Sequence, residues 1–138
     1  TLRNRFLSRM YCAERIMGQM DFHDERIIIK YLKINSSHTT ITTMPMGYSY
    51  GLSIINTHLE SGSKIVVSDK TIFDKEFWNK VNKYKVTSFG GVPQFYEQLK
   101  KIKFENFNLS SLKYLTQAGG KLDKNFLNYF KNVCMKKK

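Results

Sequence analysis

Short runs of β-branched and apolar residues alternate with segments of helical spacing from residue 39 onward. The strand-like runs occupy residues 39–45, 64–68, 86–92 and 110–120. A segment with apolar residues every three or four positions follows each run, and the units recur about every 25 residues. Such βα units are typical of a parallel sheet with helices on both faces. The pattern predicts an α/β fold with about four parallel strands flanked by helices.

Single residues mark where the predicted helices begin and end. After the first strand, Leu52, Ile55 and Leu59 have helical spacing and form the predicted apolar face, and Gly62 is placed to end this helix. Pro93 opens the third helix, at a position where proline is tolerated.

The second helix, within residues 74–85, has the clearest amphipathic pattern. Asp74 is its predicted N-cap, and Phe77, Trp78, Val81 and Tyr84 form its predicted apolar face. A fourth helix is expected at 122–133.

The first 38 residues have a helical but irregular pattern. Apolar residues recur at three- and four-residue spacing in 3–17 and 24–34, and a segment with Gly18 and the candidate caps Asp21 and Asp24 interrupts them. We therefore predict a helical lead-in at 1–38 and an α/β subdomain at 39–138. The chain begins with Thr1 and has no leader pattern, so we expect it to be a piece of a longer polypeptide.

Charge and composition narrow the classes of function. The formal net charge is +12, but lysines alternate with acids in 68–85 and arginine is confined to the first 26 residues. This favours a compositional bias over nucleic-acid binding, which stays an alternative. No apolar run reaches the roughly 20 residues of a membrane span. Cys12 and Cys134 lie far apart, which favours a reducing, cytoplasmic location.

The segment GYSYG at 47–51 has the spacing of a serine-hydrolase nucleophile elbow. That fold requires an acid and then a histidine after the nucleophile. Only His58 follows Ser49, and no acid lies between them. In a helix, nine residues would separate the two by roughly 13 Å, whereas catalysis needs a hydrogen bond. The sequence therefore disfavours a hydrolase.

Metal and phosphate motifs are also weak. His23, His38 and His58 are isolated, which makes a poor metal site, and we expect them at the surface or in caps. The pair Gly90-Gly91 follows a strand but belongs to no phosphate-loop motif, so by itself it indicates a tight turn.

Three stretches together carry a resemblance to a known family. They are TMPMGYSYGLSIINTHLESGSKIVV (43–67), VTSFGGVPQFYEQL (86–99) and LSSLKYLTQAGGKL (109–122). In this order they resemble the large domain of AMP-forming acyl-activating enzymes, and the likeness covers about residues 39–133. The resemblance implies activation of a carboxylic acid by ATP and Mg²⁺ to an acyl-adenylate. The acyl group would then pass to CoA or to the pantetheine of a carrier protein.

The resemblance also implies roles for individual residues. Tyr48 would border the acyl pocket and thiol tunnel, Tyr50 would face the carboxylic substrate, and Gly51 would allow close approach. Gly91 would also line the substrate pocket.

A second set of positions, Ala118, Gly119, Gly120 and Lys121, would line one face of the adenine of AMP. Glycine suits backbone on which a flat base stacks. Open α/β sheets bind ligands at such carboxyl ends of strands.

Several parts of the family pattern are missing from the 138 residues: the Ser/Thr/Gly-rich phosphate loop, the Tyr-Gly-x-Thr-Glu stretch, the ribose-binding aspartate and the catalytic lysine. We therefore expect no catalytic residue in this segment, no tightly bound cofactor and an inactive isolated chain. No acid stands near Tyr48 to pair with an amino group, which favours a fatty, aryl or small organic acid. Missing neighbour strands predict self-association. A flavodoxin-like binding module is the remaining alternative.

Overall fold

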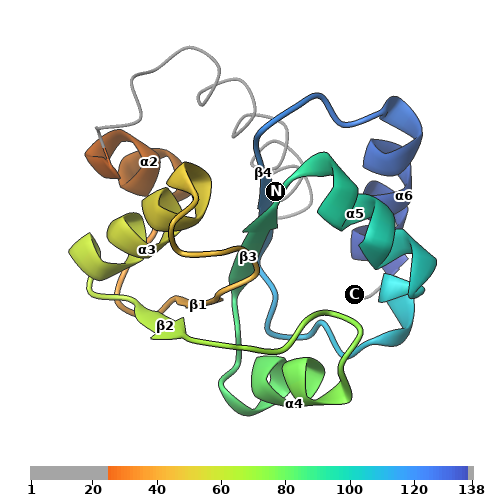
Figure 1. Ribbon diagram of the computed structural model, residues 1–138, viewed down its shortest axis with the longest axis horizontal. Coiled ribbons are helices and arrows are strands. Elements are labelled where there is room, and N and C mark those ends of the chain that lie inside the picture. Colours follow the sequence, from red (N-terminus) through yellow and green to blue (C-terminus); the bar gives the residue numbers. More distant parts are fainter. Residues whose placement is uncertain (1–24, 137–138) are drawn as a thin grey trace.

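The computed structural model describes residues 25–136, which form one sheet with helices on both sides (Figure 1). The strands are β1 (Thr39–Ile41), β2 (Lys64–Val66), β3 (Ser88–Gly91) and β4 (Tyr114–Gln117). Every pairing is parallel, and the strand order is β2-β1-β3-β4. The predicted α/β fold with a four-stranded parallel sheet is therefore confirmed.

The helices divide between the two faces of this sheet. They are α2 (Glu25–Leu32), α3 (Ser49–Glu60), α4 (Lys75–Lys83), α5 (Pro93–Lys101) and α6 (Lys124–Lys136), with a 3-10 turn η1 (Phe104–Asn106). In Figure 1, α2 and α3 lie to the left of β3, whereas α5 and α6 lie to its right. Alternate residues of β3 follow this division, because Ser88 faces His58 of α3 and Phe89 contacts Phe95 of α5.

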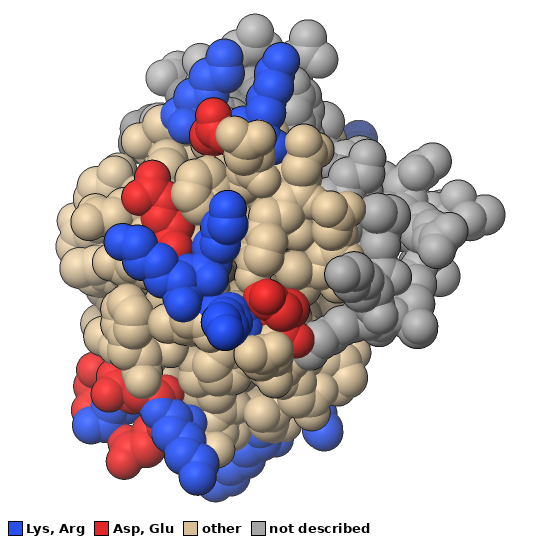
Figure 2. Space-filling model, turned by 90° about the vertical axis from the view of Figure 1, so that its right-hand side faces the viewer, with Lys and Arg blue, Asp and Glu red and all other residues tan. Residues whose placement is uncertain are grey.

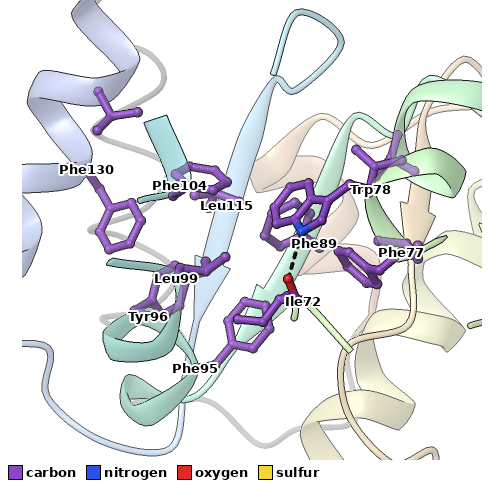
Figure 3. Packing of buried hydrophobic residues seen from close by; sticks show 14 of the residues in the cluster. Ile72, Phe77, Trp78, Phe89, Phe95, Tyr96, Leu99, Phe104, Leu115 and Phe130 are labelled. Carbon is purple, nitrogen blue, oxygen red and sulfur yellow. Dashed lines mark hydrogen bonds between the residues drawn. The ribbon is translucent and has the colours of Figure 1, made fainter. Parts of the chain in front are cut away.

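The face covered by α4, α5 and α6 holds an aromatic core (Figure 3). Phe89 lies at its centre, with ring centroids 6.0 Å from Phe95 and 6.3 Å from Phe104. Trp78 stacks on Phe107 at 3.9 Å, and its indole N–H donates a 2.7 Å hydrogen bond to the Ile72 carbonyl. Aromatic rings bury large apolar areas, so this face supplies most of the hydrophobic stabilisation.

The predicted face of α4 is correct except at one residue. Phe77, Trp78 and Val81 are buried, whereas Tyr84 is 47% exposed. Tyr84 is the residue that caps the helix after Lys83, and it lies beyond the packed turns.

The predicted face of α3 was wrong. Leu52 and Leu59 are 48% and 63% exposed, and the buried residues include Ser53, Thr57 and His58. The sheet surface under α3 explains this, because Thr40, Ser88 and Thr116 present hydroxyl groups there. Hydroxyl groups that leave water require hydrogen-bonding partners, and a polar helix stripe satisfies this requirement better than leucines.

The helix boundaries agree with most of the sequence signals. Pro93 is the first residue of α5, and Gly62 follows the end of α3 with a φ of +67°. Asp74 stands at the N-cap of α4, but its carboxylate accepts 2.8 Å hydrogen bonds from the Thr71 N–H and hydroxyl, not from the helix. These bonds lower the pKa of the Asp74 carboxyl.

The described residues include only part of the segment 1–38 for which a helical lead-in is predicted. Helix α2 confirms helical structure within 24–34, whereas the predictions for residues 1–24, including Cys12, Gly18, Asp21, His23 and Asp24, lie outside the described residues. The side chain of Cys134 also lies outside them, and the division at residue 38 stays a prediction. None of the helices within 25–136 is long and apolar enough to cross a membrane.

Candidate functional site

The carboxyl ends of β1, β3 and β4 bring the predicted site segments to one edge of the sheet. Residues 42–48 follow β1, Val92 follows β3, and 118–121 follow β4. Because β1 lies between β2 and β3, the strand order reverses at the β1–β3 pair. Open α/β sheets bind ligands outside the carboxyl ends at such a switch point. The topology thus identifies this edge as the candidate site without reference to any motif.

Tyr48 and Gly119 face each other at this edge. Tyr48 is the exposed N-cap residue of α3, fixed by a 3.0 Å hydrogen bond from its N–H to the Pro45 carbonyl. A Cβ placed on Gly119 would lie 3.4 Å from the Tyr48 hydroxyl and 3.2 Å from Val92 Cγ1. The loop after β1 and the turn after β4 therefore meet, with a side-chain-free backbone on one side.

The four predicted adenine positions form an exposed turn after a buried strand. Ala118 is buried, whereas Gly119, Gly120 and Lys121 are exposed. Gly119 has a φ of +81°, a conformation that residues with a side chain rarely adopt. The Gln117 side-chain amide donates a 2.6 Å hydrogen bond to the Gly120 carbonyl and fixes the turn. The turn offers bare main chain to solvent beside Tyr48.

Tyr50 lies beneath this surface. It is buried, and its hydroxyl donates a 2.8 Å hydrogen bond to Thr116 Oγ1. Burial raises the pKa of the Tyr50 hydroxyl, so the phenol is neutral. The bond joins the first turn of α3 to β4, two residues before Ala118. Its role toward substrate stays a prediction.

The two predicted substrate glycines are close-packed. A Cβ on Gly51 would lie 2.8 Å from the Pro45 carbonyl oxygen, so glycine lets α3 approach the preceding loop. A Cβ on Gly91 would lie 2.3 Å from Phe95 Cδ1, which directs this position toward α5 and the aromatic core. Their assignment to the substrate also stays a prediction.

Gly90 packs against Tyr50 and Thr116, and the sequence analysis did not predict it as a site residue. A Cβ there would lie 2.5 Å from Thr116 Oγ1 and 2.7 Å from the Tyr50 hydroxyl. The signal was present, because strand residues alternate between faces and Gly90 shares its face with Ser88. The Thr43 hydroxyl also donates to the Gly90 carbonyl and so ties the loop after β1 to β3.

The structure excludes the serine-hydrolase arrangement. Ser49 and His58 both belong to α3, so about 13 Å of helix separates them. His58 Nδ1 lies 2.7 Å from the Ile54 carbonyl, and Nε2 lies 3.4 Å from Ser88 Oγ. Burial lowers the pKa of this imidazole. The expectation of a surface position was wrong for both His58 and His38, which are buried.

Within residues 25–136, no group of three or more His, Cys, Asp or Glu residues could hold a metal ion.

Comparison with known proteins identifies the class. A protein-family model described as AMP-binding enzyme matches residues 15–137. A search of curated proteins found no match. Because the family model covers most of the 138 residues, the chain belongs to the AMP-binding enzyme family, an adenylate-forming family of ligases. The resemblance in the three sequence stretches is thereby confirmed.

Proposed function

We propose that this chain is part of an ATP-dependent ligase that activates a carboxylic acid as an acyl-adenylate and transfers the acyl group to a thiol. The acceptor is CoA or the pantetheine of a carrier protein, and the setting is the reducing cytoplasm. Family membership supports the adenylate chemistry. The observation that carries the assignment of residues is the approach of Tyr48 to the bare Gly119 turn at the strand-order switch point.

The Gly119 turn fits an adenine ring. A planar base stacks on main chain only where no side chain intervenes, and Gly119 and Gly120 provide two such residues in succession. In the proposal, Ala118 to Lys121 bind the adenine base. Tyr48 lines the neighbouring acyl pocket and the tunnel through which the thiol enters. ATP, when bound, would supply the adenylyl group that activates the carboxylate, and pyrophosphate would be the leaving group. The residues of this chain bind and orient the reactants.

Charge neutralisation must come from elsewhere in the proposed ligase. The 138 residues contain no phosphate-loop motif, and the described residues contain no cluster suited to Mg²⁺. Fixed charges and dipoles at the phosphates normally supply most of the rate enhancement. The proposal therefore includes weak nucleotide binding and no catalysis by the isolated chain.

Substitution of Gly119 by Val tests the nucleotide site. In NMR titrations of the 138-residue chain with AMP, we expect amide shifts at Ala118–Lys121 and Tyr48. The Gly119→Val variant should lose them, because its Cβ would approach Val92 and Tyr48. Gly62→Val is the matched control, because Gly62 also has a positive φ but lies after the far end of α3.

Two outcomes would contradict the proposal. One is an AMP response at other residues, or an equal loss in both variants. The other is carboxylate-dependent exchange of pyrophosphate with ATP by the 138 residues alone, which would refute the inactivity of the chain.

The proposed substrate is an acid without an amino group. The segment 45–53 contains no Asp or Glu that would pair with a substrate ammonium. A panel of fatty, aryl and amino acids, assayed by pyrophosphate exchange with the longer protein, distinguishes these classes. Preference for an amino acid would contradict this part of the proposal.

Self-association of the chain is the last part of the proposal. Within residues 25–136, β2 and β4 each have only one neighbouring strand. Sheet edges without a neighbour promote pairing between copies. Light scattering over a range of concentrations should show oligomers, and a monomer at all concentrations would disprove them.

A further inference from the structure

A groove of about 1160 Å³ lies at the edge of the sheet opposite the candidate site. The groove is lined by residues at the amino ends of the strands, by all of β2 and by the segment before β4. The carboxyl-terminal half of α4 completes the lining. The lining residues are Ser37, Thr39, 64–67, Lys80, 83–85, Thr87 and 110–113. Residues of the proposed adenylate site contribute nothing to it.

All the charged residues that line this groove are basic. Five lysines line it, namely Lys64, Lys80, Lys83, Lys85 and Lys113, and no Asp or Glu does. Lys80 Nζ lies 3.6 Å from Asp69, outside the lining. No described carboxylate forms an ion pair with the other four. In contrast, the face in Figure 2 shows blue basic residues interrupted by red carboxylates.

An apolar strip runs beside the lysines. Ile65 and Val66 are half-buried, and Val67 and Tyr84 are 64% and 47% exposed. All three residues of β2 line the groove, at one end of the described sheet. Thr39, Thr87 and 110–113 continue the lining past the starts of β1 and β3 to the residues before β4. The groove therefore runs across the amino ends of the strands.

We propose that this groove binds an acidic, extended segment of a partner protein. The segment would lie across the amino ends of the strands, from β2 to the residues before β4, with apolar side chains toward Ile65, Val67 and Tyr84 and carboxylates toward the lysines. Complementary charge raises the association rate and selects the partner. The position on the opposite edge makes this surface independent of the adenylate-forming site.

Two other occupants fit the groove less well. Nucleic-acid sites combine base-reading arginines with several aromatic platforms, whereas this lining has no arginine and one aromatic residue, Tyr84. A symmetric contact between two copies at this groove would place five lysines against five lysines, so the self-association proposed above would use the β4 edge instead.

Fluorescence anisotropy with a defined probe tests the proposal. The probe is a labelled peptide of repeating Glu-Val-Glu-Thr, about 12 residues long; extended, it measures about 40 Å, which exceeds the width of four strands spaced about 4.8 Å apart. Wild-type chain should bind it at about 50 mM salt and more weakly at higher salt. The double variant Lys64→Glu, Lys113→Glu should weaken binding at least about tenfold, since two attractions become repulsions.

The matched control changes the same charge elsewhere. Lys75 and Lys124 are exposed first residues of α4 and α6, outside the groove, and glutamate is favourable at helix starts. Lys75→Glu, Lys124→Glu should change the affinity less than about twofold. Circular dichroism confirms that each variant is folded.

Three results would overturn the proposal. These are an equal loss in both double variants, absence of peptide binding by the wild-type chain, and displacement of the peptide by single-stranded RNA of the same charge at lower concentration. The first means general charge attraction, and the third means a nucleic-acid surface. None of them bears on the adenylate-forming assignment.

Discussion

The two faces of the sheet are packed by different chemistry. The face under α4, α5 and α6 is built from aromatic and aliphatic side chains around Phe89. The face under α3 is built from hydrogen-bonded groups, including the Tyr50–Thr116 pair and His58 beside Ser88. Both faces exclude water, and described buried side-chain polar atoms all have partners.

The aromatic face mainly stabilises the fold, whereas the polar face mainly fixes the positions of the site residues. Apolar contacts are non-directional, so the contacts of the aromatic face constrain the orientation of its helices less strictly than hydrogen bonds do. Hydrogen bonds have narrow geometry, so the polar face fixes the start of α3 relative to the end of β4. Tyr48 and Gly119 stand at the two ends of that connection. A binding site requires its residues at fixed distances from one another, and the hydrogen bonds of the polar face maintain the distance between these two.

Truncation in the aromatic face should have the largest effect. Phe89→Ala removes the ring at the centre of the cluster, so we expect the free energy of unfolding to fall by about 3–5 kcal/mol. Urea denaturation followed by circular dichroism measures it. Phe73→Ala, at an exposed ring, should cost less than about 0.5 kcal/mol. Similar losses for both would mean that the cluster is not the main source of stability.

Removal of one hydroxyl from the polar face should cost less. Tyr50→Phe deletes the donor to Thr116, so we expect a loss of about 0.5–1.5 kcal/mol in the same denaturation assay. Tyr48→Phe, at an exposed ring, is the control and should change stability little. If the Tyr50 variant lost as much as Phe89→Ala, the contrast between the faces would fail.

The polar face should also be sensitive to acid. Burial lowers the pKa of His58, so below about pH 6.5 the unfolded chain takes up a proton that the folded chain refuses. Stability is then full above this pH and falls as the pH decreases toward the folded pKa. An NMR titration of the His58 ring should give a midpoint below about 6.5. His58→Gln should reduce the acid-dependent loss, and a midpoint at or above 6.5 would contradict the prediction.

Helix ends should respond equally on both faces, with the smallest effect. Lys33 and Lys85 follow α2 and α4 with φ of 54° and 52°, a left-handed conformation that favours glycine. Lys33→Gly and Lys85→Gly should each raise the free energy of unfolding by about 0.5–1 kcal/mol. Lys30→Gly, inside α2, should lower it by about as much. A gain at only one site would show that the packed face controls the helix end.

The sequence predicted the order of elements because that order depends on local signals. Pro93 and Gly62 act through their own backbone, and β-branched runs favour strands wherever they pack. These signals identified the strands, helices and parallel sheet. The family motifs then located Tyr48 and Gly119, and the topology brings both to one edge.

The buried face of α3 could not be predicted in the same way. The spacing of apolar residues indicates a helix face with leucines. Which face is buried depends on the side chains of the sheet beneath it, and here these are Thr40, Ser88 and Thr116. Those hydroxyl groups select Thr57 and His58 over Leu52 and Leu59. The environments of His58 and Gly90 depend on contacts between α3, β3 and β4, which no single stretch of sequence contains.

The parallel order of the strands also has a consequence for the rate of folding. β1 pairs with β3 through Thr40 and Ser88, so this contact forms only after the chain has brought together two distant points and arranged two crossovers. Contacts of long sequence separation slow folding. We therefore expect the helices to form in microseconds and the central strand pair to close much later, as the rate-limiting event.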